Sequence, residues 1–167
     1  MQDETDGLLA AWQRERPDLD VAPLAVLSRV TRLARHLDRE RRAAFAEHGL
    51  EAYEFDVLTA LRRAGPPYEL TPGQLVRETL VGSGTMTNRL DRLEARGLID
   101  RRPDPEDGRA RRIRLSDRGR DHADAAVADL LERERRLLAG LSERDRRTLA
   151  SLLRTVLVNF EGRAADA

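Results

Sequence analysis

The order of helical and extended patterns between residues 71 and 115 restricts the fold of this chain more than any other feature. Thr71-Pro72 supplies an N-cap and an N1 proline for a short helix. After a short turn, Ser83 is expected to cap a second helix that ends at Gly97. Two extended runs, LIDRR and RRIRL, follow this helix and flank the turn PDPEDGRA. The pattern predicts a helix–turn–helix followed by a β-hairpin.

A helix–turn–helix followed by a hairpin is the winged-helix arrangement, in which the second helix enters the DNA major groove. The charge of the hairpin supports this interpretation. Between Arg101 and Arg120 there are eight arginines and four acidic residues, whereas the whole chain has a formal net charge of zero. A basic wing is typical of phosphate contact. The alternatives are a solvated charged turn and a chance helix–turn–helix pattern in an all-helical protein.

The rest of the chain shows apolar residues at helical spacing. Helices are expected from Asp3 to about Arg16, from Pro23 to His48, from Glu54 to Ala64, from Ser116 to about Gly140 and from Ser142 onward. The length of 167 residues suits one domain with helical extensions. The predicted fold class is therefore mainly α with a small β-hairpin.

The composition argues against catalysis and metal binding. The chain has no Cys, which excludes disulfides, thiolate metal sites and cysteine nucleophiles. The three histidines His36, His48 and His122 are scattered, and no glycine-rich phosphate loop is present. We therefore predict no catalytic residue, no metal and no cofactor. The acidic start MQDETDG and the lack of a run of about 18 apolar residues predict a cytoplasmic protein without a membrane segment.

The predicted second helix has one apolar face, with Met86, Leu90 and Leu93 inward. Its opposite face and N-terminal end are left for DNA. The candidates for DNA contact are Ser83, Thr85, Thr87, Asn88 and Arg92 on this helix and Arg109 and Arg111 in the wing. Asn pairs bidentately with adenine, but Ser and Thr contact any base, so no operator sequence follows. Gly84 would allow a close approach to DNA, and Ser83 could be an N-cap alone.

The run GTMTNRLDRLEARGLIDRRPDPEDGRARRIRL resembles the multiple antibiotic resistance regulator (MarR) family of winged-helix transcription factors. The resemblance covers about residues 24–160. It implies an obligate homodimer that binds a pseudopalindromic operator and usually represses transcription. One departure lies at the wing tip, where the family often has a second basic residue between Asp and Arg. This chain has Asp107-Gly108-Arg109, so the arginine is retained.

Unpartnered apolar stripes on the N-terminal, penultimate and last helices independently favour a partner chain. We expect residues 1–50 to form dimerisation helices and a ligand-pocket wall, residues 51–115 to form the winged helix–turn–helix, and residues 116–167 to form C-terminal dimerisation helices of one intertwined domain. The leading hypothesis is a ligand-responsive regulator that is not an enzyme. The alternatives are a winged helix that uses its hairpin for protein contacts and a dimeric helical enzyme with a site between subunits.

A helix with a Trp ahead of the usual first helix resembles the urate-responsive and PecS-like branch of this family. The resemblance implies an effector site made of Trp12, Asp56, Arg89 and Arg101. The implied effector is a small anion, such as urate or a carboxylate, that displaces Asp56 from an arginine. The second helix of the helix–turn–helix, the recognition helix, then shifts. Trp12 could equally pack in the dimer, Asp56 could be an exposed acid, and Arg101 could contact a phosphate.

Overall fold

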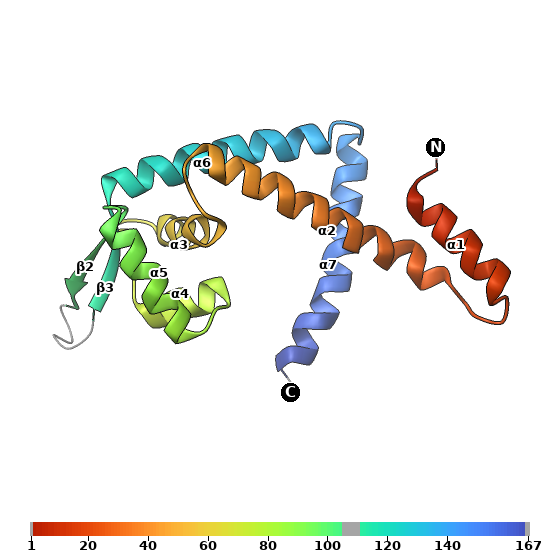
Figure 1. Ribbon diagram of the computed structural model, residues 1–167, viewed down its shortest axis with the longest axis horizontal. Helices are drawn as coiled ribbons and strands as arrows, with labels where there is room; N and C mark the ends of the chain where they lie inside the picture. The colour runs from red at the N-terminus through yellow and green to blue at the C-terminus, as the bar shows by residue number, and fades with distance from the viewer. Residues whose placement is uncertain (1, 105–110, 166–167) are drawn as a thin grey trace. The chain divides into compact units, whose positions relative to one another are not determined.

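The computed structural model describes residues 2–104 and 111–165 and is mostly helical, as expected (Figure 1). Its helices are α1 (Glu4–Glu15), α2 (Ala22–Glu47), α3 (Ala52–Arg63), α4 (Pro72–Thr79), α5 (Ser83–Ala95), α6 (Asp117–Leu137) and α7 (Glu143–Ala165). Its strands are β1 (Glu69–Leu70), β2 (Ile99–Pro103) and β3 (Arg111–Leu115). The chain forms two compact units, Met1–Ala126 and Val127–Ala167, whose boundary falls within α6. The predicted helices and the hairpin strands are confirmed.

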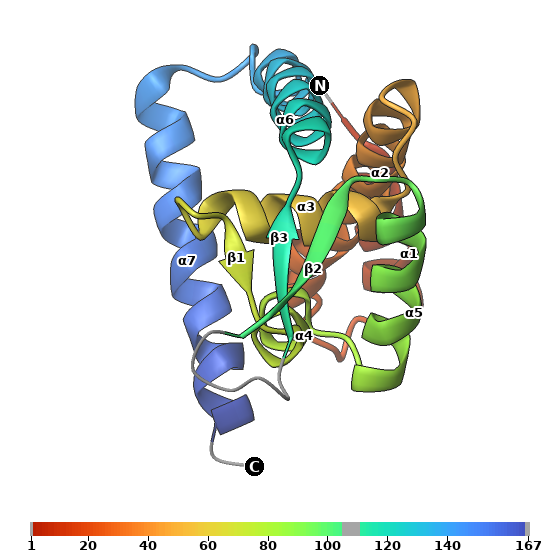
Figure 2. The same ribbon diagram turned by 90° about the vertical axis from the view of Figure 1, so that its left-hand side faces the viewer.

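The sheet is antiparallel with the strand order β1-β3-β2 (Figure 2). The hairpin register pairs Ile99 with Leu115 and Arg101 with Ile113. On the other side of β3, Glu69 pairs with Arg114. Strand β1 was not expected from the sequence, because a strand of two residues is too short to show an alternating pattern.

The core of the first unit lies where α3, α4 and α5 meet the sheet. The largest fully buried apolar side chains are Leu58, Leu61, Leu75, Met86, Leu93, Leu98, Ile99 and Ile113. The inward stripe predicted for α5 is thus confirmed for Met86 and Leu93, and Leu90 is also buried. Gly97 ends α5 in the left-handed region, with φ of 67°. Such a conformation favours glycine, so the predicted helix stop is confirmed.

One predicted helix cap is wrong. Ser83 is the first residue of α5, and the N-cap is Gly82 in an extended conformation (φ −68°, ψ 152°) without a side-chain cap. Thr71 caps α4 as predicted, since its hydroxyl accepts a hydrogen bond from the Gln74 amide at 3.2 Å. Ser116 likewise accepts a bond from the Gly119 amide at 2.9 Å at the start of α6.

The N-terminal helix α1 packs along the N-terminal half of α2 (Figure 1). Arg29 of α2 contacts Asp3 at 2.8 Å and Asp6 at 2.6 Å, and Arg32 pairs with Glu4. Asp3 also caps α1 by accepting a hydrogen bond from the Thr5 amide at 2.8 Å. Three ion pairs therefore connect the acidic helix to α2.

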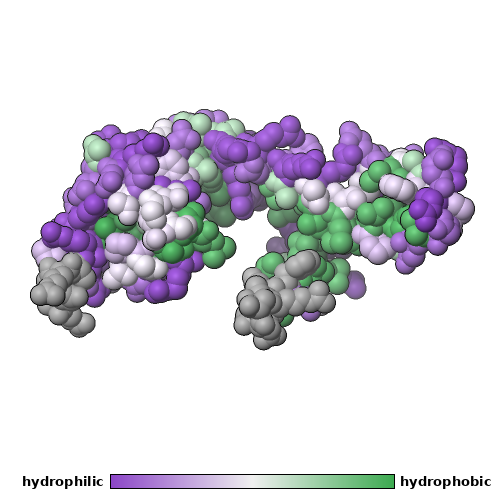
Figure 3. Space-filling view, turned by 60° about the horizontal axis from the view of Figure 1, so that its bottom comes forward, coloured by the Kyte–Doolittle hydropathy of each residue, from purple (hydrophilic) through white to green (hydrophobic). Residues whose placement is uncertain are grey.

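Long apolar faces remain exposed within a single chain. On α2 they comprise Val26, Leu27, Val30 and Leu33. In the second unit they comprise Leu131, Leu137, Leu138, Leu141, Leu149, Leu152, Leu153, Val156, Leu157 and Val158. Figure 3 shows hydrophobic surface over both α2 and α7. Among the described residues, no helix is long and apolar enough to cross a membrane.

Candidate nucleic-acid interface and effector site

The recognition helix α5 exposes the polar face that the sequence predicted. Ser83, Thr85, Thr87, Asn88 and Arg92 are all exposed, opposite the buried apolar stripe. The Thr87 hydroxyl donates a hydrogen bond to the Ser83 carbonyl oxygen at 3.3 Å. A side chain added at Gly84 would meet nothing within 4 Å. The first turn of α5 is therefore accessible to a DNA groove. The roles of the individual residues remain predictions.

The wing contributes fewer free cations than its sequence suggests. Arg112 lies 2.8 Å from the buried carboxylate of Asp104, and Arg114 lies 3.9 Å from Glu69. Arg111 is exposed, as a phosphate contact requires, whereas the predicted contact Arg109 lies outside the described residues. Arg112 and Arg114 thus form ion pairs with Asp104 and Glu69 beside the sheet, which a count of charges does not reveal.

Asp56 of α3 and Arg89 of α5 lie in one electrostatic neighbourhood. Although Asp56 keeps an exposed surface, desolvation raises the pKa of its carboxyl group above the ordinary aspartate value. Attraction from Arg89, Arg41 and Arg63 opposes that rise in the pKa. The structure therefore brings together two of the four predicted effector residues and adds two arginines that the sequence analysis missed.

Tyr53 is a further residue of this site. The Arg89 guanidinium lies over the Tyr53 ring, with its carbon 5.1 Å from the ring centroid, which is a cation–π contact. Tyr53 precedes Asp56 by three residues on α3, so the two side chains lie on the same face of that helix. This spacing was the available sequence signal for Tyr53.

A small pocket opens beside Asp56 between α3 and the end of α4. Its volume is about 180 Å³, and its lining residues are Asp56, Thr59, Arg63, Glu78, Thr79 and Leu80. Leu80 has a left-handed conformation with φ of 53° and is 92% exposed. Ligand pockets usually enclose at least about 300 Å³. An effector of ordinary size would therefore need further walls beyond these six residues.

The other two predicted effector residues lie elsewhere in this chain. Arg101 pairs with Asp91 and lies 3.2 Å from Glu94, and both of these acids belong to α5. Trp12 is 43% exposed on α1, which lies at the end of α2 away from α3 and α5 (Figure 1). Arg101 thus touches the recognition helix, but neither residue joins Asp56 and Arg89 within one chain.

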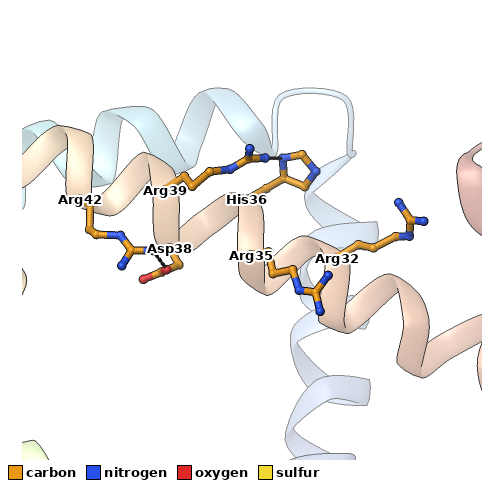
Figure 4. A pocket seen from close by; sticks show the side chains of 6 residues that line it. All are labelled: Arg32, Arg35, His36, Asp38, Arg39 and Arg42. Carbon is orange, nitrogen blue, oxygen red and sulfur yellow. Dashed lines mark hydrogen bonds and ion pairs between the residues drawn. The ribbon is translucent and has the colours of Figure 1, made fainter.

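A second, open depression of about 420 Å³ lies entirely on α2 (Figure 4). It is lined by Arg32, Arg35, His36, Asp38, Arg39 and Arg42. Asp38 and Arg42, four positions apart, form an ion pair, and Arg39 lies 2.7 Å from the His36 ring nitrogen. Because all six side chains belong to one helix, the depression is a charged surface and not an enclosed site.

Comparison with known proteins identifies the family. The MarR family model matches residues 48–110. The HTH-type transcriptional regulator PecS of Dickeya dadantii is 38% identical over 136 residues, which cover 81% of this chain and 82% of PecS. The HTH-type transcriptional repressor NicR of Pseudomonas putida is 31% identical over 113 residues, covering 65% and 70%. A crystal structure of a mutant MarR from E. coli matches with a TM-score of 0.69 and 26% identity, covering 83% of this chain and 99% of that chain.

These likenesses confirm the winged-helix fold and a role in transcription without enzymatic activity. The chain is a member of the MarR family of DNA-binding transcriptional regulators.

Proposed function

We propose that this protein is a homodimeric repressor that binds an inverted-repeat operator and is released by a small anionic or aromatic effector. One observation carries the proposal: α5 has an exposed polar face for DNA and, on its flank, an arginine held beside Asp56 and Tyr53. A ligand that binds Arg89 therefore acts directly on the recognition helix α5. The similarity to NicR, a transcriptional repressor, supports repression as the direction of control.

The dimer is proposed from the exposed apolar faces. Exposed leucines and valines cover α2 and the second unit. Their burial against another surface would stabilise the protein, because it removes apolar area from water. A second copy of the chain offers the same faces, and two-fold symmetry matches an isologous interface. We propose that residues 1–50 and 116–167 form this interface around the DNA-binding segment 51–115. Two recognition helices would then lie about 34 Å apart, one turn of B-DNA.

The release step is proposed from charge. In the empty protein the carboxylate of Asp56 attracts Arg89, and a bound carboxylate or urate-like anion would replace that attraction. Trp12 and Arg101 are proposed to complete the site. Binding linkage then requires that operator DNA weaken effector binding by the same factor as effector weakens DNA binding.

The DNA-binding part of the proposal is tested with duplexes that the protein itself selects from a random-sequence pool. The selected sequence should be an inverted repeat, footprinted symmetrically by a species of dimer mass. Asn88→Ala should change the preference among base pairs. Arg109→Ala and Arg111→Ala should weaken binding to all sequences and lower the salt slope by about one unit each. Selection of an asymmetric site by a monomer would overturn the proposal.

A further inference from the structure

The C-terminal end of the recognition helix is held by Arg96, the C-cap residue of α5. Its guanidinium donates one hydrogen bond to the carboxylate of Glu54, near the start of α3, and another to the Gly49 carbonyl oxygen at 2.7 Å. Gly49 follows the end of α2 in the left-handed region, with φ of 64°. One side chain thus ties α5 to the junction between α2 and α3.

Glu54 is an unusual partner because its side chain is only 2% exposed, whereas that of Arg96 is 38% exposed. A buried carboxylate is costly unless it is paired and hydrogen-bonded. Besides the bond from Arg96, the Glu54 carboxylate accepts a hydrogen bond from the Glu51 amide at 2.9 Å. The buried acid therefore requires Arg96 at this place, and α5 cannot move far from α3 without exposing or orphaning the charge.

The first turns of α6 hold the same end of α5 from another side. The Arg118 guanidinium donates to the Arg96 carbonyl oxygen at 3.2 Å, and the Ser116 hydroxyl donates to the Gly97 carbonyl oxygen at 2.8 Å. One turn further along α6, Nδ1 of His122 lies 3.2 Å from the His48 carbonyl oxygen, where only a protonated nitrogen can donate. The end of α5 is thus attached to elements that lead into α2 and α6.

We propose that Arg96 is a positioning residue for sequence-specific DNA binding: by bridging Glu54 and the Gly49 carbonyl, it fixes the angle at which α5 presents its N-terminal turn to the groove. The lever is long. A helix of 13 residues is about 20 Å long, so a tilt of about 10° at Arg96 moves its first turn by about 3 Å. Hydrogen bonds to base edges tolerate only a few tenths of an ångström.

Positioning differs from DNA contact and from general stability in what it affects. Sequence-specific binding needs the exact tilt of α5, whereas nonspecific binding rests on phosphate contacts that tolerate reorientation. Loss of the bridge should therefore lower the affinity for the selected duplex and leave the affinity for a random duplex nearly unchanged. The inference concerns DNA binding alone and requires no effector.

The test compares Arg96→Met with Arg62→Met in the full-length protein. Arg62 is the matched control: its side chain is 39% exposed, and it pairs at 2.8 Å with Asp124, an acid of another helix. The probes are a duplex selected by the wild-type protein and a random-sequence duplex of the same length. We expect Arg96→Met to lower the affinity for the selected duplex at least tenfold, with random-duplex affinity and salt slope unchanged. Arg62→Met should change neither affinity.

Two results would overturn the inference. Wild-type affinity of Arg96→Met for the selected duplex would show that the bridge does not position α5. An equal loss on both duplexes, with a salt slope lower by about one unit, would make Arg96 a phosphate contact instead.

Arg96→Lys decides the matter if the Met variant does not fold. Lysine keeps the charge beside Glu54 but lacks the fork that reaches two acceptors at fixed geometry. We expect it to lose several-fold affinity for the selected duplex only, and full wild-type specificity in this variant would refute the role of the bridge.

Discussion

Arg89 of the recognition helix lies over the ring of Tyr53, with 5.1 Å between its guanidinium carbon and the ring centroid. The same arginine attracts the carboxylate of Asp56, one turn along α3. The flank of α5 is therefore attached to α3 by a cation–π contact and a charge attraction, both of which an anion can disturb. Arg96 holds the end of the helix, and Arg89 is where an effector would act.

The effector role of Arg89 leads to the first prediction. Arg89→Ala should weaken binding of the effective anion, chosen by screening urate and aromatic carboxylates, at least tenfold, because the cation that receives it is gone. Trp12, the only tryptophan, provides the fluorescence signal for the titration. Arg92→Ala is the matched control, since this exposed arginine lies on the face of the same helix that we propose for DNA contact, and its loss should affect DNA binding alone. An unchanged anion affinity in Arg89→Ala would contradict the assignment of Arg89 as an effector-binding residue.

Asp56→Asn should stabilise the protein at neutral pH but not in acid. Desolvation raises the folded-state pKa of Asp56 above its unfolded value, so the folded state favours the protonated carboxyl. The contribution of Asp56 to stability is complete below the unfolded pKa and is lost as the pH rises through the raised pKa. Melting temperatures of both proteins across the acid range test this. A difference that does not grow with pH would contradict it.

Gly84→Ala should fold normally and bind DNA less well. A Cβ at Gly84 meets nothing within 4 Å in the free protein, and alanine is the better helix former. If the backbone of α5 approaches the groove at this point, the added methyl group must clash with DNA. The measurements are the melting temperature and the affinity for the selected duplex. Equal affinity for the two proteins would place Gly84 away from the DNA backbone and bases.

The helix boundaries could be predicted because local residues determine them. Gly49, Gly65 and Gly97 all have positive φ where the sequence indicated helix ends. Ser83 was wrong as a cap because its neighbour Gly82 takes the extended conformation without needing a side-chain bond. Such an alternative between adjacent cap residues depends on where the chain enters the helix, which packing decides.

The ion pairs across the fold could not be predicted from local patterns. Glu54 and Arg96 are 42 positions apart, and each looks like an ordinary surface charge on its own helix. The same is true of Arg101, which pairs with Asp91 and Glu94 of α5. The proximity of Asp56 and Arg89 was expected only through the family resemblance, because the helical pattern alone makes Asp56 an exposed acid.

The attachment of α1 should depend on salt and acid. Arg29 holds the pKa of the Asp3 carboxyl below its ordinary value, so this contribution is present above the unfolded pKa and is lost as the pH falls through the lowered one. Arg29→Met should detach α1, and a free helix of 12 residues is marginal in water. The Trp12 emission should then shift to the red and helicity should fall.

Arg14→Met is the control for this experiment, because the partner of Arg14 is Glu15 on α1 itself. High salt should mimic Arg29→Met in the wild-type protein by screening exposed pairs. If the Arg29→Met and Arg14→Met proteins had the same Trp12 emission, the charge pairs would not be what holds α1 on α2.

Gly119→Ala should destabilise the protein although Gly119 lies within α6, where alanine is normally favoured by about 1 kcal/mol. A Cβ at this position would clash with the Leu98 carbonyl oxygen, a backbone atom that cannot rotate away. The start of α6 would have to separate from the turn after the recognition helix, where Ser116 binds the Gly97 carbonyl. Overpacking of this kind costs about 1–3 kcal/mol, so the net effect should be a lower melting temperature.

Gly7→Ala in α1 is the matched control, because its Cβ would meet nothing within 4 Å and only the gain in helix propensity should remain. Melting curves of the two variants decide the point: a Gly119→Ala protein as stable as Gly7→Ala would show that α6 does not pack this closely against Leu98.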